Sequence, residues 1–120
     1  MDKSQGKKTY NLEDRTLNYS KELINFLVTI PKSTINNNLV NQVSRSGTSV
    51  GANYREANET ETKKDFAFRI RICRKEAKET VYWLELLGEA NPNLMAKIDS
   101  FKQEAIEFVK IFAAIILKSK

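Results

Sequence analysis

Apolar residues recur at steps of three and four along most of this chain, and this spacing is the feature that most restricts its fold. The pattern is cleanest near the C-terminus, in a row that alternates steps of four and three: Leu94, Ile98, Phe101, Ala105, Phe108, Phe112 and Ile115. Such a row occupies one face of an α-helix and is typical of the seam of a helical bundle. No segment alternates apolar and polar residues as a half-buried strand does. The sequence therefore predicts an all-α protein.

Stop and start signals divide the periodic sequence into four predicted helices. Pro31 ends the first, the segment NETET at 58–62 separates the second from the third, and Asn91-Pro92 separates the third from the fourth, with Asn91 as its cap. The predicted helices cover about residues 12–30, 37–58, 63–88 and 93–117. Joined by short connectors, they predict an up-down-up-down four-helix bundle over residues 11–120, after a flexible basic tail at residues 1–10.

The first three helices also have predicted core faces. These are Leu17, Ser20, Ile24, Leu27 and Val28 in the first, Leu39, Val43, Gly47, Val50, Tyr54 and Ala57 in the second, and Phe66, Ile70, Cys73, Ala77, Thr80, Leu84 and Leu87 in the third. Gly47 and Gly51 disfavour helix, so they indicate either a break or the close approach of a neighbouring helix. We favour close approach, because the apolar spacing continues through both glycines. Thr62 and Asp65 resemble a capping box that starts the third helix.

The fourth helix carries a second apolar row beside its seam. The row consists of Ile106, Val109, Ala113, Ile116 and Leu117. A helix in a monomeric bundle needs only one apolar face. The surplus predicts that the chain associates with copies of itself through its C-terminal half.

The absence of histidine from all 120 residues excludes several kinds of active site. A Ser-His or Cys-His nucleophile, a zinc site that uses histidine and the Glu-x-x-His pairs of di-iron bundles all need this residue. The single cysteine, Cys73, excludes an internal disulfide and lies on a core stripe, as an inert small apolar residue would. We therefore expect no metal site and no cofactor.

The longest apolar run, Ile111 to Leu117, is far too short to span a membrane. The N-terminal sequence MDKSQGKK is not followed by the apolar region of a signal peptide. The sequence therefore predicts a cytoplasmic protein without membrane contact.

A polar ladder runs along the second helix beside its apolar stripe. It consists of Gln42, Arg45, Ser49, Asn53 and Glu56, which lie within about 80° of one another at about 100° per residue. The ladder could bind a ligand, hydrogen-bond to adjacent helices or subunits, or face solvent. We favour a structural or assembly role, because buried polar groups need partners and thereby set the register of packed helices.

Two carboxylates and a tryptophan lie on one flank of the third helix. Glu76 and Glu79 could form an acid–base pair, but we expect them to pair with Arg45 or Arg55 across the bundle. We expect the ring of Trp83 to pack as an anchor while its indole N–H finds an acceptor. The sequence thus predicts no enzymatic activity.

A basic face lies opposite the apolar stripe of the third helix. Its members, Arg71, Arg74, Lys75 and Lys78, fall within about 100° of arc at about 100° per residue, in a chain of net charge +5. The face could follow the phosphates of RNA or DNA, or it could be solvated, as most runs of charge are. These four residues are the first candidates for phosphate contact. No aromatic platform, base-reading motif or zinc finger is evident in the sequence.

The residues of the second and third helices together resemble a known family. The motif residues are Gln42, Arg45, Ser46, Ser49, Asn53, Glu56 and Ala57, then Lys64, Asp65 and Phe66, then Lys75, Glu76, Ala77, Glu79, Thr80, Trp83 and Leu84. They resemble the bacterial four-helix-bundle proteins encoded in 23S rRNA intervening sequences, over essentially the whole chain. The resemblance implies a ring-like homopentamer with no known enzymatic activity.

This family is also similar to the accessory variability protein of diversity-generating retroelements. That protein is a basic pentamer that binds nucleic acid and partners a reverse transcriptase, so the similarity implies a reverse transcriptase partner by analogy alone. The alternative for the present chain is a purely structural or protein-adaptor oligomer without nucleic-acid binding.

Overall fold

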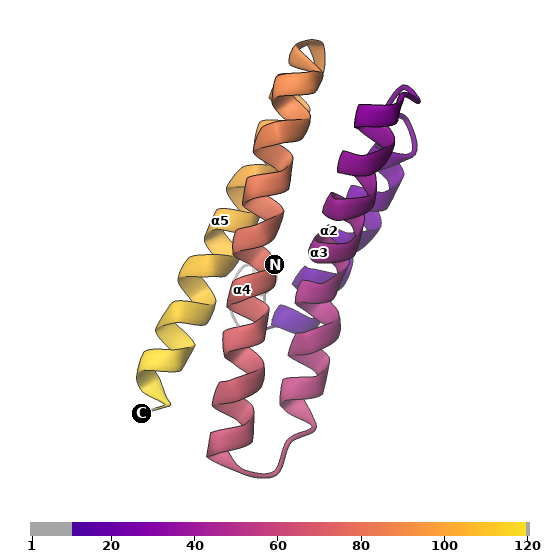
Figure 1. Ribbon diagram of the computed structural model, residues 1–120. Helices are drawn as coiled ribbons and strands as arrows, with labels where there is room; N and C mark the ends of the chain where they lie inside the picture. The colour runs from indigo at the N-terminus through magenta and orange to yellow at the C-terminus, as the bar shows by residue number, and fades with distance from the viewer. Residues whose placement is uncertain (1–10, 120) are drawn as a thin grey trace, which may run out of the picture.

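The computed structural model describes residues 11–119, which form a bundle of four long helices. These are α2 at Leu12–Leu27, α3 at Thr34–Asn58, α4 at Lys63–Ala90 and α5 at Met95–Lys118, with a 3-10 turn, η1, at Pro92–Leu94. Successive helices run in opposite directions, with α2 and α3 on one side of the bundle and α4 and α5 on the other (Figure 1). Residues 11–119 contain no strand. The flexible tail predicted for residues 1–10 lies outside the described residues.

Local hydrogen bonds explain where the helices begin and end. The first predicted helix reaches residue 30, but α2 ends at Leu27 because Thr29 and Ile30 donate to carbonyls three residues back in a tighter turn. α3 begins three residues before its predicted start, because Ser33 Oγ accepts the N–H of Asn36 at 3.0 Å. The predicted cap at Thr62 is confirmed, since its Oγ1 accepts the N–H of Asp65 at 3.0 Å.

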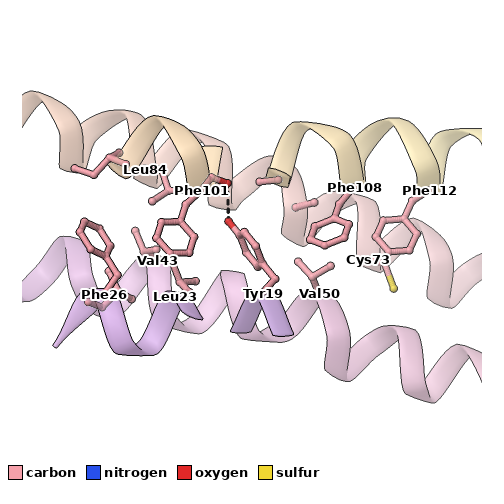
Figure 2. Packing of buried hydrophobic residues seen from close by; sticks show 14 of the residues in the cluster. Tyr19, Leu23, Phe26, Val43, Val50, Cys73, Leu84, Phe101, Phe108 and Phe112 are labelled. Carbon is pink, nitrogen blue, oxygen red and sulfur yellow. Dashed lines mark hydrogen bonds between the residues drawn. The ribbon is translucent and has the colours of Figure 1, made fainter. Parts of the chain in front are cut away.

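The core of the bundle is built from facing rows of aromatic and aliphatic side chains. Tyr19 of α2 packs edge-on against the rings of Phe101 and Phe108 of α5, with centroids 5.8 and 5.3 Å apart. Its hydroxyl donates a hydrogen bond to the Phe101 carbonyl oxygen at 2.9 Å, the dashed line in Figure 2. The predicted seam of the fourth helix is buried from Ile98 to Phe112, as the alternating spacing indicated.

Of the core face predicted for the first helix, Leu27 is buried and Ser20 half-buried, but the other three residues are wrongly placed. Leu17, Ile24 and Val28 are 36%, 47% and 69% exposed, and they form an apolar stripe on the outside of α2. The buried face is instead Leu12, Thr16, Tyr19, Leu23, Phe26 and Leu27. Both rows have helical spacing, so periodicity alone did not distinguish them. The row with Tyr19 and Phe26 buries two large rings, and aromatic side chains bury the most apolar area per residue.

The two glycines of α3 mark the close approach of α2, as predicted, and the helix continues through both. A Cβ atom on Gly47 would collide with Leu23, which is fully buried. A Cβ atom on Gly51 would lie 2.8 Å from Thr16 Oγ1 and 3.0 Å from Thr16 Cβ. Glycine therefore sets the spacing between α2 and α3.

The second apolar row of α5 is mostly covered by the chain itself. Ile116 is buried, Ile106, Val109 and Ala113 are half-buried, and only Leu117, at 69% exposed, faces solvent. The surplus apolar surface predicted there is thus smaller than the sequence suggested. The larger exposed stripe lies on α2.

A buried pair of amides joins the α2–α3 connection to the end of α4. Asn91 Nδ2 donates to Asn36 Oδ1 at 2.9 Å and to the Leu87 carbonyl at 2.9 Å, while Asn36 Nδ2 donates to Asn91 Oδ1 at 3.1 Å and to the Pro31 carbonyl at 2.9 Å. Asn91 occupies the predicted N-cap position, with Pro92 at the start of η1, but its side chain turns back to α4 and makes no capping hydrogen bond to η1.

Candidate nucleic-acid interface

The outer face of α4 carries the predicted basic residues. Arg71, Lys75 and Lys78 are exposed and Arg74 is half-buried. Lys75 Nζ lies 3.8 Å from Glu79 Oε2, in a surface ion pair. Within residues 11–119, the other three basic residues have no carboxylate within 4.0 Å. Three cations on this face are thus free to meet an anion.

Two aromatic side chains share this face, and the sequence-based prediction missed them. Phe68 and Tyr82 are each 58% exposed. The ring of Tyr82 packs edge-on against that of Trp83, with centroids 5.0 Å apart and an interplanar angle of 76°. The signal was present in the sequence, because both residues continue the three-and-four spacing of the basic residues in the direction opposite to the core.

Arg45, in the N-terminal part of the polar ladder, forms charge contacts with two carboxylates of α4. Arg45 Nη2 lies 3.5 Å from Glu79 Oε1, and Arg45 Nη1 lies 3.9 Å from Glu76 Oε1. Arg45 also donates to Gln42 Oε1 at 3.4 Å. Of the two arginines considered as partners, Arg45 is therefore the one that contacts both carboxylates.

The other ladder residues form hydrogen bonds within α3 or to α4, or face solvent. Ser49 Oγ donates to the Arg45 carbonyl at 2.7 Å, and Asn53 Nδ2 donates to the Ser49 carbonyl at 2.9 Å. Asn53 Oδ1 accepts from Arg69 Nη1 of α4 at 3.3 Å. Glu56 is exposed. The ladder thus links α3 to α4 at two levels, which is a structural arrangement.

Glu76 is the most deeply buried charged group on the α3–α4 contact. The residue is 8% exposed, and Glu76 Oε1 accepts no hydrogen bond within residues 11–119. Next to it, Thr80 Oγ1 donates to Ser46 Oγ at 2.9 Å in a fully buried contact that the sequence did not reveal. Burying a carboxylate is costly unless it is paired. Arg45 therefore offsets the charge of Glu76 without completing its hydrogen bonds.

Trp83 is half-buried and packs against the core cluster, as expected of an anchor. Its indole N–H, however, donates to no other group in residues 11–119, so the predicted acceptor is missing there. Because the side chain is only half-buried, the N–H does not need a protein acceptor in the way a fully buried donor would.

Cys73 is fully buried, and desolvation raises the pKa of its thiol to about 12. The thiolate, which is the reactive form, is therefore scarce at neutral pH. This agrees with the prediction of an inert core cysteine.

A cleft of about 610 Å³ lies between α2 and α5, and its walls carry charges of both signs. Arg15 spans it with a two-pronged ion pair, Nε to Glu104 Oε2 at 2.8 Å and Nη2 to Glu104 Oε1 at 2.9 Å. The hydrogen bond to Glu104 raises the pKa of Arg15, and burial raises the pKa of Tyr19 beneath it. Arg15 and Glu104 thus neutralise each other, and the other charged lining residues, Asp14, Glu22 and Lys97, leave the cleft with a net negative charge. It does not favour an anion such as a phosphate.

Within residues 11–119, no group of three or more His, Cys, Asp or Glu side chains could hold a metal ion. None of the helices in this part of the chain is long and apolar enough to cross a bilayer.

Comparisons with known proteins agree with the helical architecture. A family model described as 23S rRNA-intervening sequence protein matches residues 8–114. A crystal structure of a protein of unknown function from the S23 ribosomal protein family of Bacteroides thetaiotaomicron is 36% identical, with a TM-score of 0.77, covering 87% of this chain and 96% of that chain. A search of the curated proteins finds no match. Because the family model covers nearly the whole bundle, this chain belongs to the 23S rRNA-intervening sequence protein family.

Proposed function

We propose that this protein binds nucleic acid by contacting phosphates through the outer face of α4. The observation that carries the proposal is the free charge of Arg71, Arg74 and Lys78, which have no carboxylate within 4.0 Å among the described residues. When cations neutralise phosphates, the condensed counterions of the nucleic acid are released, and this favours binding without base contacts. The net charge of +5 adds a general attraction for an anionic polymer.

Reversing these three cations is expected to abolish nucleic-acid binding. The variant Arg71→Glu/Arg74→Glu/Lys78→Glu removes the contacts, whereas Lys75 is left because Glu79 already partners it. A filter-binding titration over a range of salt concentrations measures the effect. For the native protein, log K should fall as log salt concentration rises, and each contacted phosphate adds about 0.7–0.9 to the magnitude of this slope. Three phosphate contacts therefore contribute about 2–3 to the slope.

A matched control distinguishes the effect of losing the α4 cations from the effect of lowering the net charge. Lys32→Glu/Lys97→Glu/Lys118→Glu reverses three exposed lysines elsewhere that also have no carboxylate within 4.0 Å among the described residues, and both triple variants take the net charge from +5 to −1. The control should retain more binding than the α4 variant. Equal loss in the two variants would mean that only net charge matters. If the native protein retains no nucleic acid at low salt, the alternative of a purely structural or adaptor oligomer replaces the proposal.

We also propose that copies of the chain associate through the outer surface of α2, forming the homopentamer that the family resemblance implies. Leu17, Ile24 and Val28 form an exposed apolar stripe, and the first two line a groove of about 340 Å³ between α2 and α3. Contiguous exposed apolar surface marks interaction sites. A ring needs two different surfaces on each copy, and the end of α5 around the exposed Leu117 is our candidate for the second.

Placing a charge on the α2 stripe is expected to dissociate the oligomer. Leu17→Glu should reduce the solution mass, measured by light scattering, toward the 13.8 kDa of one chain. Leu86→Glu is the matched control, because Leu86 on α4 is equally exposed at 36% and should leave the mass unchanged. A native protein that is already monomeric at high concentration would contradict the proposal, and so would dissociation by Leu86→Glu alone.

The contacts of the two candidate acid–base residues support a non-catalytic role. Glu76 and Glu79 share Arg45 as an ionic partner, and Glu79 also contacts Lys75. Acid–base catalysis needs a pocket that admits a substrate, and neither carboxylate lines the α2–α5 cleft or the α2–α3 groove. We therefore propose a binding protein without enzymatic activity.

A further inference from the structure

Two exposed aromatic rings stand at the ends of the basic row on α4. The row runs Phe68, Arg71, Lys75, Lys78 and Tyr82, with steps of three, four, three and four. At about 100° per residue these five side chains fall within about 80° of arc. At about 1.5 Å per residue the row is about 21 Å long. The outer face of α4 is thus a straight strip with a ring at each end and three cations between.

Both rings face solvent and do not contribute to the buried core. Single exposed apolar residues are common on protein surfaces. These two, however, are each 58% exposed and in register with the cations. The ring of Tyr82 is also supported from one side by Trp83, which packs against the core cluster. A supported ring has less freedom to lose when a planar group stacks on it.

Exposed rings combined with cations suit a single strand better than a duplex. In a duplex the bases are stacked on one another and paired, so their faces are not available to side chains. In a single strand every base has a free π-face, and proteins that bind single strands combine basic grooves with aromatic side chains for stacking.

We propose that the outer face of α4 binds single-stranded nucleic acid. Bases stack on Phe68 and Tyr82, and the phosphates between them contact Arg71, Lys75 and Lys78. The exposed ion pair between Lys75 and Glu79 opens at little cost, because surface ion pairs contribute little. This inference rests on the proposed nucleic-acid binding and specifies the form of the ligand.

Removing the rings is expected to weaken single-strand binding selectively. Fluorescence anisotropy would compare a labelled 15-nucleotide mixed-sequence single strand, as RNA and as DNA, with the duplex of each. Phe68→Ala and Tyr82→Ala should each weaken single-strand binding by about fivefold to 150-fold, the measured range for one base–aromatic stack. Duplex binding should change by less than about twofold, because it depends on the cations alone. Tyr82→Phe keeps the ring and should retain single-strand binding.

The remaining outcomes separate this inference from the proposed function. If Arg71→Glu/Arg74→Glu/Lys78→Glu abolishes binding but the alanine variants bind single strands normally, the inference fails and the proposed function stands. Equal loss of duplex and single-strand binding in the alanine variants would also overturn the inference. If the alanine variants instead reduce the solution mass, the rings belong to a contact between copies of the chain. A native protein that binds neither form overturns both proposals.

Discussion

Replacing Phe108 with alanine is expected to lower the free energy of unfolding by about 3–5 kcal/mol, the usual cost of truncating a fully buried phenylalanine. Phe108 has no exposed surface, and its ring meets Tyr19 edge-on at 5.3 Å and Phe112 at 6.3 Å. The guanidinium of Arg15 also lies 5.3 Å from the ring centroid. These neighbours come from two helices, so they cannot close over the cavity without moving α2 toward α5.

Phe68→Ala provides the matched control for this experiment. It makes the same chemical change on the exposed face of α4, where the ring is 58% exposed, and should cost less than about 1 kcal/mol. Urea unfolding followed by circular dichroism measures both, at one protein concentration because self-association would add to apparent stability. Equal destabilisation by the two variants would mean that the centre of the core has been wrongly located.

The second large effect is expected at the buried amide pair. Asn91→Asp replaces a donor that serves both Asn36 Oδ1 and the Leu87 carbonyl with a carboxylate oxygen that can only accept. Asn91 is 6% exposed, so the new charge would be buried facing two acceptors. Asn36 Nδ2 can still donate to one carboxylate oxygen, but a buried charge without an ionic partner typically costs about 3–5 kcal/mol. We expect a loss of this size at neutral pH.

The loss in Asn91→Asp should depend on pH. Burial favours the neutral acid and raises the pKa of the new carboxyl above the ordinary value of about 3.9. Below that value the acid is protonated in both states and can still donate one hydrogen bond, so the loss is smallest. It should grow as the pH rises above about 4 and be complete above the folded-state pKa.

Asn93→Asp is the matched control, because it makes the same change at an exposed residue two positions along the chain. Its free energy of unfolding should stay within about 0.5 kcal/mol of that of the native protein at both pH 4 and pH 7. Urea titrations at pH 4 and pH 7 measure both variants. If Asn91→Asp is no less stable than Asn93→Asp at pH 7, the amide pair does not contribute to the stability of the fold.

Much of the helical arrangement was predictable because it depends on spacing along the chain. The seam from Ile98 to Phe112 was recognisable from its steps of four and three, and Gly47 and Gly51 were recognisable as a close contact because the apolar period continued through them. The cap at Thr62 followed from residue types three positions apart. Each of these features involves residues within one helix.

The features that the sequence did not reveal join residues that are far apart in the chain. Asn91 was interpreted as a helix-start signal, yet its side chain pairs with that of Asn36 across 55 positions. The sequence left open whether Arg45 or Arg55 would contact Glu76 and Glu79, because this depends on how far α3 is shifted along α4. In the structure, Arg45 contacts both carboxylates. Offsets of this kind are set by the packing of whole helices, which no local pattern records.

By itself, the sequence determined that the described part of this protein is helical and which residues form the buried faces of α3, α4 and α5 as far as Phe112, because one period of three and four residues specifies a helix and its apolar side together. Only the tertiary structure decided which of two equally periodic rows on α2 is buried, because that choice depends on the area the other helices can cover. The same choice left Leu17, Ile24 and Val28 outside. The side of α4 that faces away from α3 and α5 likewise exposes Phe68 and Tyr82 beside its cations. The proposed functions depend on this face and on the apolar stripe of α2.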